Sequence, residues 1–391
     1  MASPPTPKIL LLGATGYIGG TVLHYLTQSA ALARCLPISV LVRGADRADK
    51  LKSAYGDQIS TVPLTTLDDL GLITRLASEH DIVVNAGTGF HPASAEALVH
   101  GLAKRKAATA GGNSGSGEGG SEVPQWIIHT SGCSNIADNP LAGDRHPEGF
   151  WLDDGDPLRT YELERDKEAR GPYLQRTAEL AVLEAGERLG VGATSLQSPA
   201  VFGPGRGLFS AAESVVPTML RFVLDQGYGC RLGDGTAQMG FVHVDDLAAL
   251  YVRVVEEVVG GGGRAVPSGR GGIVFASVGM VKLVDIARDC VGAVARKGII
   301  QINETKEVIK EVDLDTVAPY FGGGDLGRHI AAVGWAGHWN TVGKVGEEKL
   351  GWKPAHRKEA WHDHGHFDRE LNAVLEGKRP LSLDKITGQK K

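Results

Sequence analysis

The chain has 391 residues, 42% of them hydrophobic, and its 41 basic and 46 acidic side chains give a net charge of −5. This balance argues against a nucleic-acid-binding surface or an anionic-membrane surface. No apolar run reaches the roughly 18 residues of a membrane-spanning helix, and we expect no signal peptide because no basic region precedes an apolar one. The four cysteines are scattered, which predicts free thiols and a cytoplasmic location.

Short apolar segments alternate with segments of helical spacing through the first half of the chain. The predicted strands are 8–12, 38–42, 60–62, 81–85, 125–129 and 192–196. The predicted helices are 17–28, 67–79, 93–108 and 173–189. Alternating strands and helices predict an α/β protein, with a Rossmann-type doubly wound parallel sheet covered by helices on both faces.

The pattern changes after residue 202, where turns and short apolar runs become frequent. We therefore expect residues 1–202 to form a dinucleotide-binding domain and 203–380 a smaller α/β substrate-binding region interleaved with it. A helix at 245–259 is expected to begin with an aspartate cap. The Gly/Ser-rich segment 110–121 predicts a flexible insertion, and residues 381–391 a polar tail.

Three glycines lie between the first predicted strand and the first predicted helix, in the pattern Gly13-Ala-Thr-Gly16-Tyr-Ile-Gly19. The first glycine permits a tight turn, the second a close approach to a pyrophosphate, and the third close packing of helix on sheet. The helix N-terminus would offer backbone N–H groups and a positive dipole end to the phosphates. The motif predicts dinucleotide binding.

The end of the second predicted strand bears on the choice between NAD and NADP. Arg43 stands there, with Arg47 four residues further on, where NAD-binding proteins have an acidic residue. A guanidinium matches the charge and geometry of a 2′-phosphate. NADP is therefore favoured, with NAD as the alternative.

Several motifs together resemble a known family. Residues 13–20 (GATGYIGG), Thr130-Ser131, 199–205 (PAVFGPG), 241–248 (FVHVDDLA) and 350–354 (LGWKP) are similar to the extended short-chain dehydrogenases of the NAD-dependent epimerase/dehydratase superfamily. The resemblance spans about residues 8–375, and the segment Gln175-Arg-Thr177 is similar to a fungal-type branch. The residues expected to contact the cofactor are Gly13, Thr15, Gly16, Tyr17, Ile18, Gly19, Arg43, Asn85, Ala86, Gly87, Thr130, Pro199 and Val201.

The resemblance implies a catalytic serine, tyrosine and lysine, in which the lysine lowers the pKa of the tyrosine. Tyr173 stands at the expected distance before Pro199, but Thr177 occupies the lysine position of the Tyr-x-x-x-Lys motif. Arg176 would have to supply the positive charge. Gly132 stands where relatives have the serine, so the hydroxyl would come from Ser131 or Ser134.

The second tyrosine candidate is Tyr161, in a charged stretch that favours a solvated helix. The alternating histidines at 362, 364 and 366 favour a polar terminal helix over a metal site, and nothing indicates that Cys133 is a nucleophile.

We thus expect an NAD(P)-dependent oxidoreductase that acts on a carbonyl or alcohol of a small metabolite, with Tyr173, Ser131 and Arg176 in catalytic roles. The missing lysine leaves two alternatives open: a redox-sensing regulator that binds the dinucleotide without catalysis, and an epimerase or dehydratase that uses bound cofactor transiently. The expected partner is a small-molecule substrate, without nucleic acid or membrane, and the oligomeric state is left open.

Overall fold

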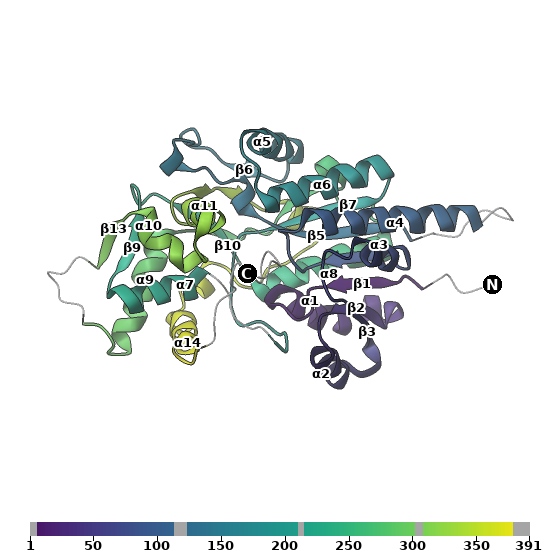
Figure 1. The fold of residues 1–391 in the computed structure, drawn as a ribbon, viewed down its shortest axis with the longest axis horizontal. Coiled ribbons are helices and arrows are strands. Elements are labelled where there is room, and N and C mark those ends of the chain that lie inside the picture. Colours follow the sequence, from purple (N-terminus) through teal and green to yellow (C-terminus); the bar gives the residue numbers. More distant parts are fainter. Residues whose placement is uncertain (1–5, 113–122, 210–214, 302–307, 378–391) are drawn as a thin grey trace.

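The computed structural model describes residues 6–112, 123–209, 215–301 and 308–377. A seven-stranded parallel sheet in the order β11-β7-β5-β4-β1-β2-β3 dominates the first lobe (Figure 1). Its strands are β1 (Ile9–Leu12), β2 (Ile38–Val42), β3 (Ile59–Pro63), β4 (Ile82–Asn85), β5 (Trp126–Gly132), β7 (Gly192–Ser198) and β11 (Ile273–Phe275). The expected Rossmann-type sheet is confirmed.

Helices cover both faces of this sheet. Those of the first lobe are α1 (Tyr17–Gln28), α2 (Ala45–Tyr55), α3 (Leu70–Ser78), α4 (Pro92–Gly112), α5 (Pro157–Arg170), α6 (Leu174–Leu189) and α8 (Val244–Gly261). Alternate side chains of β1 divide between two cores: Ile9 and Leu11 join α1 and α8, whereas Leu10 and Leu12 join α3, α4 and α6. Burial on both faces explains why β1 is a continuous apolar run.

The second lobe, on the left in Figure 1, packs around a smaller sheet with β10 at its centre. Its strands are β8 (Ala200–Phe202), β9 (Gly229–Leu232), β10 (Gln238–His243), β12 (Gly279–Lys282), β13 (Ile309–Val312) and β14 (His338–Trp339), and β6 (Leu152–Asp153) pairs with β15 (Thr341–Val342). Its helices are α7 (Val215–Gln226), α9 (Leu283–Arg296), α10 (Leu314–Val317), α11 (Gly324–Trp335), α13 (Lys358–Trp361) and α14 (His364–Leu375), whereas α12 (Val345–Glu348) packs beside β11 on the first lobe. Through β11 and α8, residues beyond 202 also complete the first lobe.

Three details differ from the sequence-based expectations. Helix α4 continues to Gly112 and so takes in the first residues of the expected insertion; 113–122 and the expected polar tail lie outside the described residues. The cap of α8 is His243, whose ring accepts from the backbone N–H of Asp245 at 3.1 Å, and not an aspartate. Helix α5 is not simply solvated, because Glu164 on it is fully buried. Within the described residues, no helix is both long and apolar enough to cross a membrane.

Candidate functional site

The glycine loop between β1 and α1 lies where the strand order reverses, because β2 and β4 flank β1 on opposite sides. Gly13 has φ +88°, and a Cβ there would lie 2.2 Å from the carbonyl oxygen of Ala86. A Cβ on Gly19 would lie 2.2 Å from the carbonyl oxygen of Gly13, whereas a Cβ on Gly16 would meet that same oxygen at 3.2 Å and nothing else within 4 Å. Gly13 and Gly19 therefore serve packing, and the open side of Gly16 fits the approach of a pyrophosphate.

Helix α1 begins beside this loop, and no side chain caps its N-terminus at Gly16. Thr15 and Ile18 are half-buried on either side of the helix start, while Tyr17 is buried and its hydroxyl donates to the carbonyl oxygen of Gly203 at 2.5 Å. An uncapped helix N-terminus is a suitable site for an anion. The Tyr17 bond ties the start of α1 to the chain that leads into the second lobe.

The other residues expected near the cofactor follow β4, β5 and β7. Asn85 donates from Nδ2 to Nδ1 of His129 at 3.0 Å, and Thr130 donates from Oγ1 to the carbonyl oxygen of Asn85 at 2.8 Å. Burial lowers the pKa of His129 to about 4, so its ring is neutral and accepts that bond. Ala86 and Gly87 directly follow β4, Pro199 directly follows β7, and Val201 lies just beyond it in β8. All therefore lie at the carboxyl-terminal edge of the sheet.

Two arginines follow β2 at the same edge. Arg43 and Arg47 are exposed, and neither has an ion pair or hydrogen bond to another described residue. Their guanidinium groups are free to meet an anion.

Tyr173 is the N-cap of α6 and is only 3% exposed. Its hydroxyl lies 3.3 Å from Oγ of Ser134, and its ring packs edge-on against Phe90 and at a 49° tilt against His329 of α11, with ring centroids 5.7 and 4.9 Å apart. Burial raises the pKa of Tyr173 to about 12. At neutral pH its phenol is therefore protonated and acts as a hydrogen-bond donor.

The side chain of Gln175 fills the space that a serine side chain at position 132 would occupy. A Cβ on Gly132 would lie 2.9 Å from Oε1 of Gln175, and that same oxygen accepts a bond from Oγ of Ser134 at 2.8 Å. The hydroxyl beside Tyr173 thus comes from Ser134. Gln175, Phe90 and His329 were not expected at this site; Gln175 stood in a noted motif, but no sequence signal pointed to His329.

At the usual lysine position, the side chain of Thr177 is hydrogen-bonded to an acidic residue of α5. Thr177 donates through its hydroxyl to Glu168, and Arg176 donates from Nε to the same carboxylate at 2.9 Å. Arg176 also donates to the carbonyl oxygens of Asn135 at 3.0 Å and Gly171 at 2.6 Å. Its Cζ lies 5.9 Å from the centre of the Tyr173 ring. Arg176 therefore places positive charge beside Tyr173, while its hydrogen bonds fasten the start of α6.

The two remaining candidates lie elsewhere. Tyr161 donates its hydroxyl to Glu184 at 2.9 Å, and burial together with this carboxylate raises its pKa to about 12. Ser131 points into the core and donates to Oε2 of Glu179 at 2.9 Å.

Glu179 belongs to a buried carboxyl pair behind the site. It and Glu164 of α5 are fully buried, and Gln197 of β7 donates from Nε2 to both, at 2.9 Å to Glu179. Burial and the neighbouring carboxyl raise the pKa of Glu164 well above its ordinary value, and burial raises that of Glu179. The pair therefore keeps a proton to higher pH than two separate, solvated glutamates would.

We expect Glu164→Gln to remove a pH dependence of stability. Unfolded glutamates release their protons above about pH 4.3, whereas the folded pair holds one to higher pH, so the wild type should lose stability as pH rises above about 4.3. The amide introduced by the substitution would donate to Glu179 and accept from Gln197 without titrating. Thermal unfolding across this range should show a flatter profile for Glu164→Gln than for the wild type or the exposed control Glu148→Gln. Parallel profiles for all three would contradict the shared proton.

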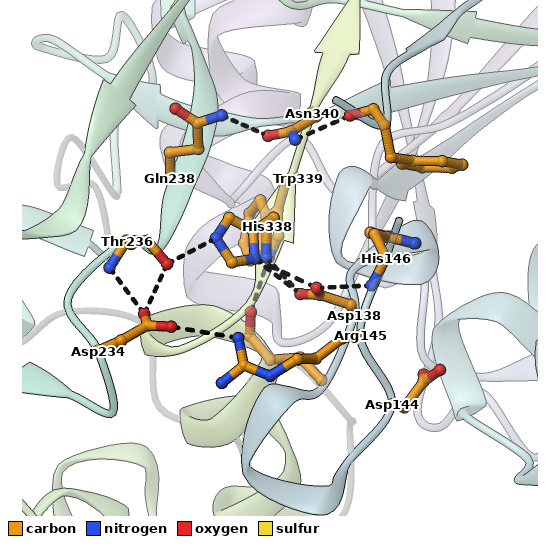
Figure 2. A network of polar contacts seen from close by, with 12 residues as sticks. Asp138, Asp144, Arg145, His146, Asp234, Thr236, Gln238, His338, Trp339 and Asn340 are labelled. Atoms are coloured by element: carbon orange, nitrogen blue, oxygen red, sulfur yellow. Dashed lines mark hydrogen bonds and ion pairs between the residues drawn. The ribbon is translucent and has the colours of Figure 1, made fainter. Parts of the chain in front are cut away.

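A polar network joins the loop after Ser134 to the second lobe (Figure 2). The carboxylate of Asp138 accepts from the backbone N–H of His338 at 2.8 Å, from the ring of His338 at 3.1 Å, and from the backbone N–H of His146 at 3.0 Å. Trp339 donates from its indole to the carbonyl oxygen of Val333 in α11 at 2.7 Å. The network thus links the Ser134 side of the site to the helix that carries His329.

The described residues contain no group of three or more His, Cys, Asp or Glu side chains that would hold a metal ion. Among the terminal histidines, His366 is buried against Phe202 and Trp361. Cys133 is fully buried, and burial raises its pKa to about 12, so its thiol is protonated and unreactive at neutral pH.

Comparisons with known proteins bear on the family and the fold of the chain. Residues 153–266 match the model of the NAD dependent epimerase/dehydratase family, and residues 9–105 match that of the saccharopine dehydrogenase NADP binding domain. The protein named oxidase ucsJ, from Acremonium sp, is 26% identical over 360 residues, which cover 89% of this chain and 93% of that protein.

Solved structures show the same fold at low identity. DesIV, a dTDP-glucose 4,6-dehydratase from Streptomyces venezuelae with NAD and TYD bound, has a TM-score of 0.59 and 15% identity, covering 95% of this chain and 98% of its own. A UDP-glucuronic acid 4-epimerase from Bacillus cereus, in complex with UDP-glucuronic acid and NAD, has a TM-score of 0.54 and 13% identity, covering 94% and 99%. The resemblance seen in the motifs is confirmed: the chain has the fold of these dehydratases and epimerases, and its residues 153–266 match the model of the NAD dependent epimerase/dehydratase family.

Proposed function

We propose that the protein is an NADP-dependent oxidoreductase that interconverts an alcohol and a carbonyl group of a small metabolite. The observation that carries this proposal is the pair of hydroxyls on Tyr173 and Ser134, 3.3 Å apart at the carboxyl-terminal edge of a dinucleotide-binding sheet. Two hydroxyls at this spacing are suited to hold one substrate oxygen. The name of the Acremonium relative, an oxidase, is consistent with redox chemistry.

The residues of the glycine loop suit a dinucleotide, since the open side of Gly16 and the uncapped start of α1 offer a place for its pyrophosphate. When bound, a nicotinamide cofactor supplies or accepts the hydride. In carbonyl reduction, Tyr173 gives its phenolic proton to the carbonyl oxygen, and the hydroxyl of Ser134 turns from Gln175 to donate its hydrogen bond to the same oxygen. In alcohol oxidation the proton moves in the opposite direction.

The functional test is a screen of secondary alcohols, aldehydes and ketones with NADP(H) and NAD(H), monitored at the absorbance of the reduced nicotinamide. Cofactor-dependent turnover supports the oxidoreductase. Tight dinucleotide binding without turnover by any substrate would instead favour a redox-sensing regulator, a function consistent with the closed lysine position at Thr177.

Arg43→Asp is expected to shift cofactor preference from NADP toward NAD, because it replaces attraction to the 2′-phosphate by repulsion. Loss of one charge-assisted hydrogen bond costs roughly 1.5–3 kcal/mol, or about tenfold or more in affinity. Calorimetric titration with each dinucleotide measures the change.

The matched control is Arg264→Asp, which makes the same charge change beside Gly263 at the opposite edge of the sheet, where Trp126 begins β5. It should leave both affinities unchanged. A wild type that already binds NAD more tightly than NADP would refute the role of Arg43.

A further inference from the structure

His329 faces Tyr173 from the second lobe. The two rings lie 4.9 Å apart between centroids, and no described residue forms a hydrogen bond with the imidazole, so its nitrogens are open to a proton. His329 is half-buried, so one side of the ring contacts Tyr173 while solvent reaches the rest. This contact joins α11 to the start of α6 directly at the proposed site.

The phenol of Tyr173 needs a partner for its proton. A buried phenol with a pKa of about 12 is a poor base at neutral pH. Thr177 at the usual lysine position and Arg176 beside it both donate hydrogen bonds to Glu168, so neither can take up the proton. The hydroxyl of Ser134 donates its hydrogen bond to the amide oxygen of Gln175. The described groups around the phenol therefore leave His329 as the titratable side chain that opens toward solvent.

We propose that His329 is the proton-exchange partner of Tyr173, an inference that rests on the proposed oxidoreductase function. In alcohol oxidation the substrate O–H proton passes to the phenolic oxygen of Tyr173, whose own proton passes to the imidazole of His329. The substrate C–H electron pair leaves as hydride to the oxidised nicotinamide dinucleotide, and a C=O bond forms. The imidazolium then releases its proton to solvent, and carbonyl reduction reverses each transfer.

Burial and the cations that face His329 keep its imidazole neutral. Burial, then the cations Arg176 of α6 and Lys167 of α5, lower the pKa of His329 below its ordinary value. These cations are paired with Glu168 and Asp144, respectively. At neutral pH the imidazole is therefore unprotonated and ready to accept a proton.

Packing fixes α11 against the Ser134 side of the site. A Cβ on Gly337, just beyond α11, would lie 2.5 Å from the carbonyl oxygen of Val333 and 2.6 Å from that of Asp138. Together with the Asp138–His338 bonds (Figure 2), this close approach holds the helix carrying His329 beside the loop carrying Ser134.

The test compares wild type, His329→Asn, His329→Gln and the remote control His100→Asn on α4, using the best alcohol from the screen with NADP⁺. In the wild type and the control, turnover should fall as pH drops through the lowered pKa of His329, because the imidazole becomes protonated. The two His329 variants should lose this acidic limb and at least about tenfold in turnover, with KM little changed. In a further variant, His329→Gly, added free imidazole should restore part of the turnover as the imidazole concentration rises.

A second measurement needs no substrate. In the cofactor-free protein, the NMR titration of His329 should give a pKa below 6.5 that shifts in Tyr173→Phe. Unchanged turnover and pH profile in His329→Asn, or a His329 that titrates at or above 6.5, would overturn the proton-exchange role alone. A wild type that turns over no substrate of the screen would overturn the oxidoreductase function and this inference with it.

Discussion

Tyr173→Phe is expected to lower turnover by about 10²- to 10⁴-fold, the usual loss when a general acid or base is removed. The change deletes one hydroxyl whose contact is a 3.3 Å approach to Ser134, and the ring contacts with Phe90 and His329 remain. The free energy of unfolding should therefore change by no more than about 1.5 kcal/mol. Steady-state kinetics with the substrate found in the screen, together with thermal unfolding, measure both quantities.

The matched control is Tyr228→Phe in the second lobe, where the ring packs on Phe222 and Lys310. It should retain full turnover. If Tyr173→Phe also turned over at the wild-type rate, Tyr173 would be an aromatic side chain that only lines the site, and the proton would have to come from another group.

Gly16→Val is expected to weaken dinucleotide binding by about 100-fold or more, equivalent to roughly 2.7 kcal/mol. The new side chain would occupy the open side of the loop, where the pyrophosphate is expected to approach, while its Cβ would meet the chain only at the Gly13 carbonyl oxygen, 3.2 Å away. The protein should therefore still fold. Calorimetric titration with NADP gives the affinity, and circular dichroism confirms the fold.

Two other glycines serve as controls for this variant. Gly71→Val, on α3, meets only a side-chain oxygen of Asp69 at 3.8 Å, and should bind NADP like the wild type. Gly19→Val should instead lower stability, because its Cβ would lie 2.2 Å from the carbonyl oxygen of Gly13. Wild-type affinity in a folded Gly16→Val protein would exclude the loop as the pyrophosphate site.

The sequence predicted the elements that local patterns encode. Segment 8–12 is apolar on both faces, and the glycine loop follows it at once, so β1, α1 and their connection could be located from the sequence. Helix α2 was missed because Leu51 is its only buried residue, which leaves no apolar stripe. The charged face of α5 concealed Glu164, since burial of a carboxyl beside another carboxyl depends on residues of α6 and β7.

The candidate site was predicted in part, for the same reason. Tyr173 and Ser134 lie on segments whose order in the chain follows the family pattern, so both could be named as candidates from the sequence. His329 reaches the site only through the packing of α11, and Gln175 matters only because Gly132 leaves room for its amide. Contacts of this kind join segments far apart in the chain, and periodicity along one segment carries no record of them.

The return of the chain to the first sheet has a consequence for biosynthesis. Strand β11 pairs with β7 through Ile273–Ser195, and α8 covers one face of the same sheet. A nascent polypeptide that has emerged only to residue 202 would have an unpaired β7 edge and an apolar sheet face open to water, a template for aggregation. The dinucleotide-binding sheet should therefore reach protease resistance only after about residue 275 has left the ribosome, so the two lobes mature together rather than one after the other.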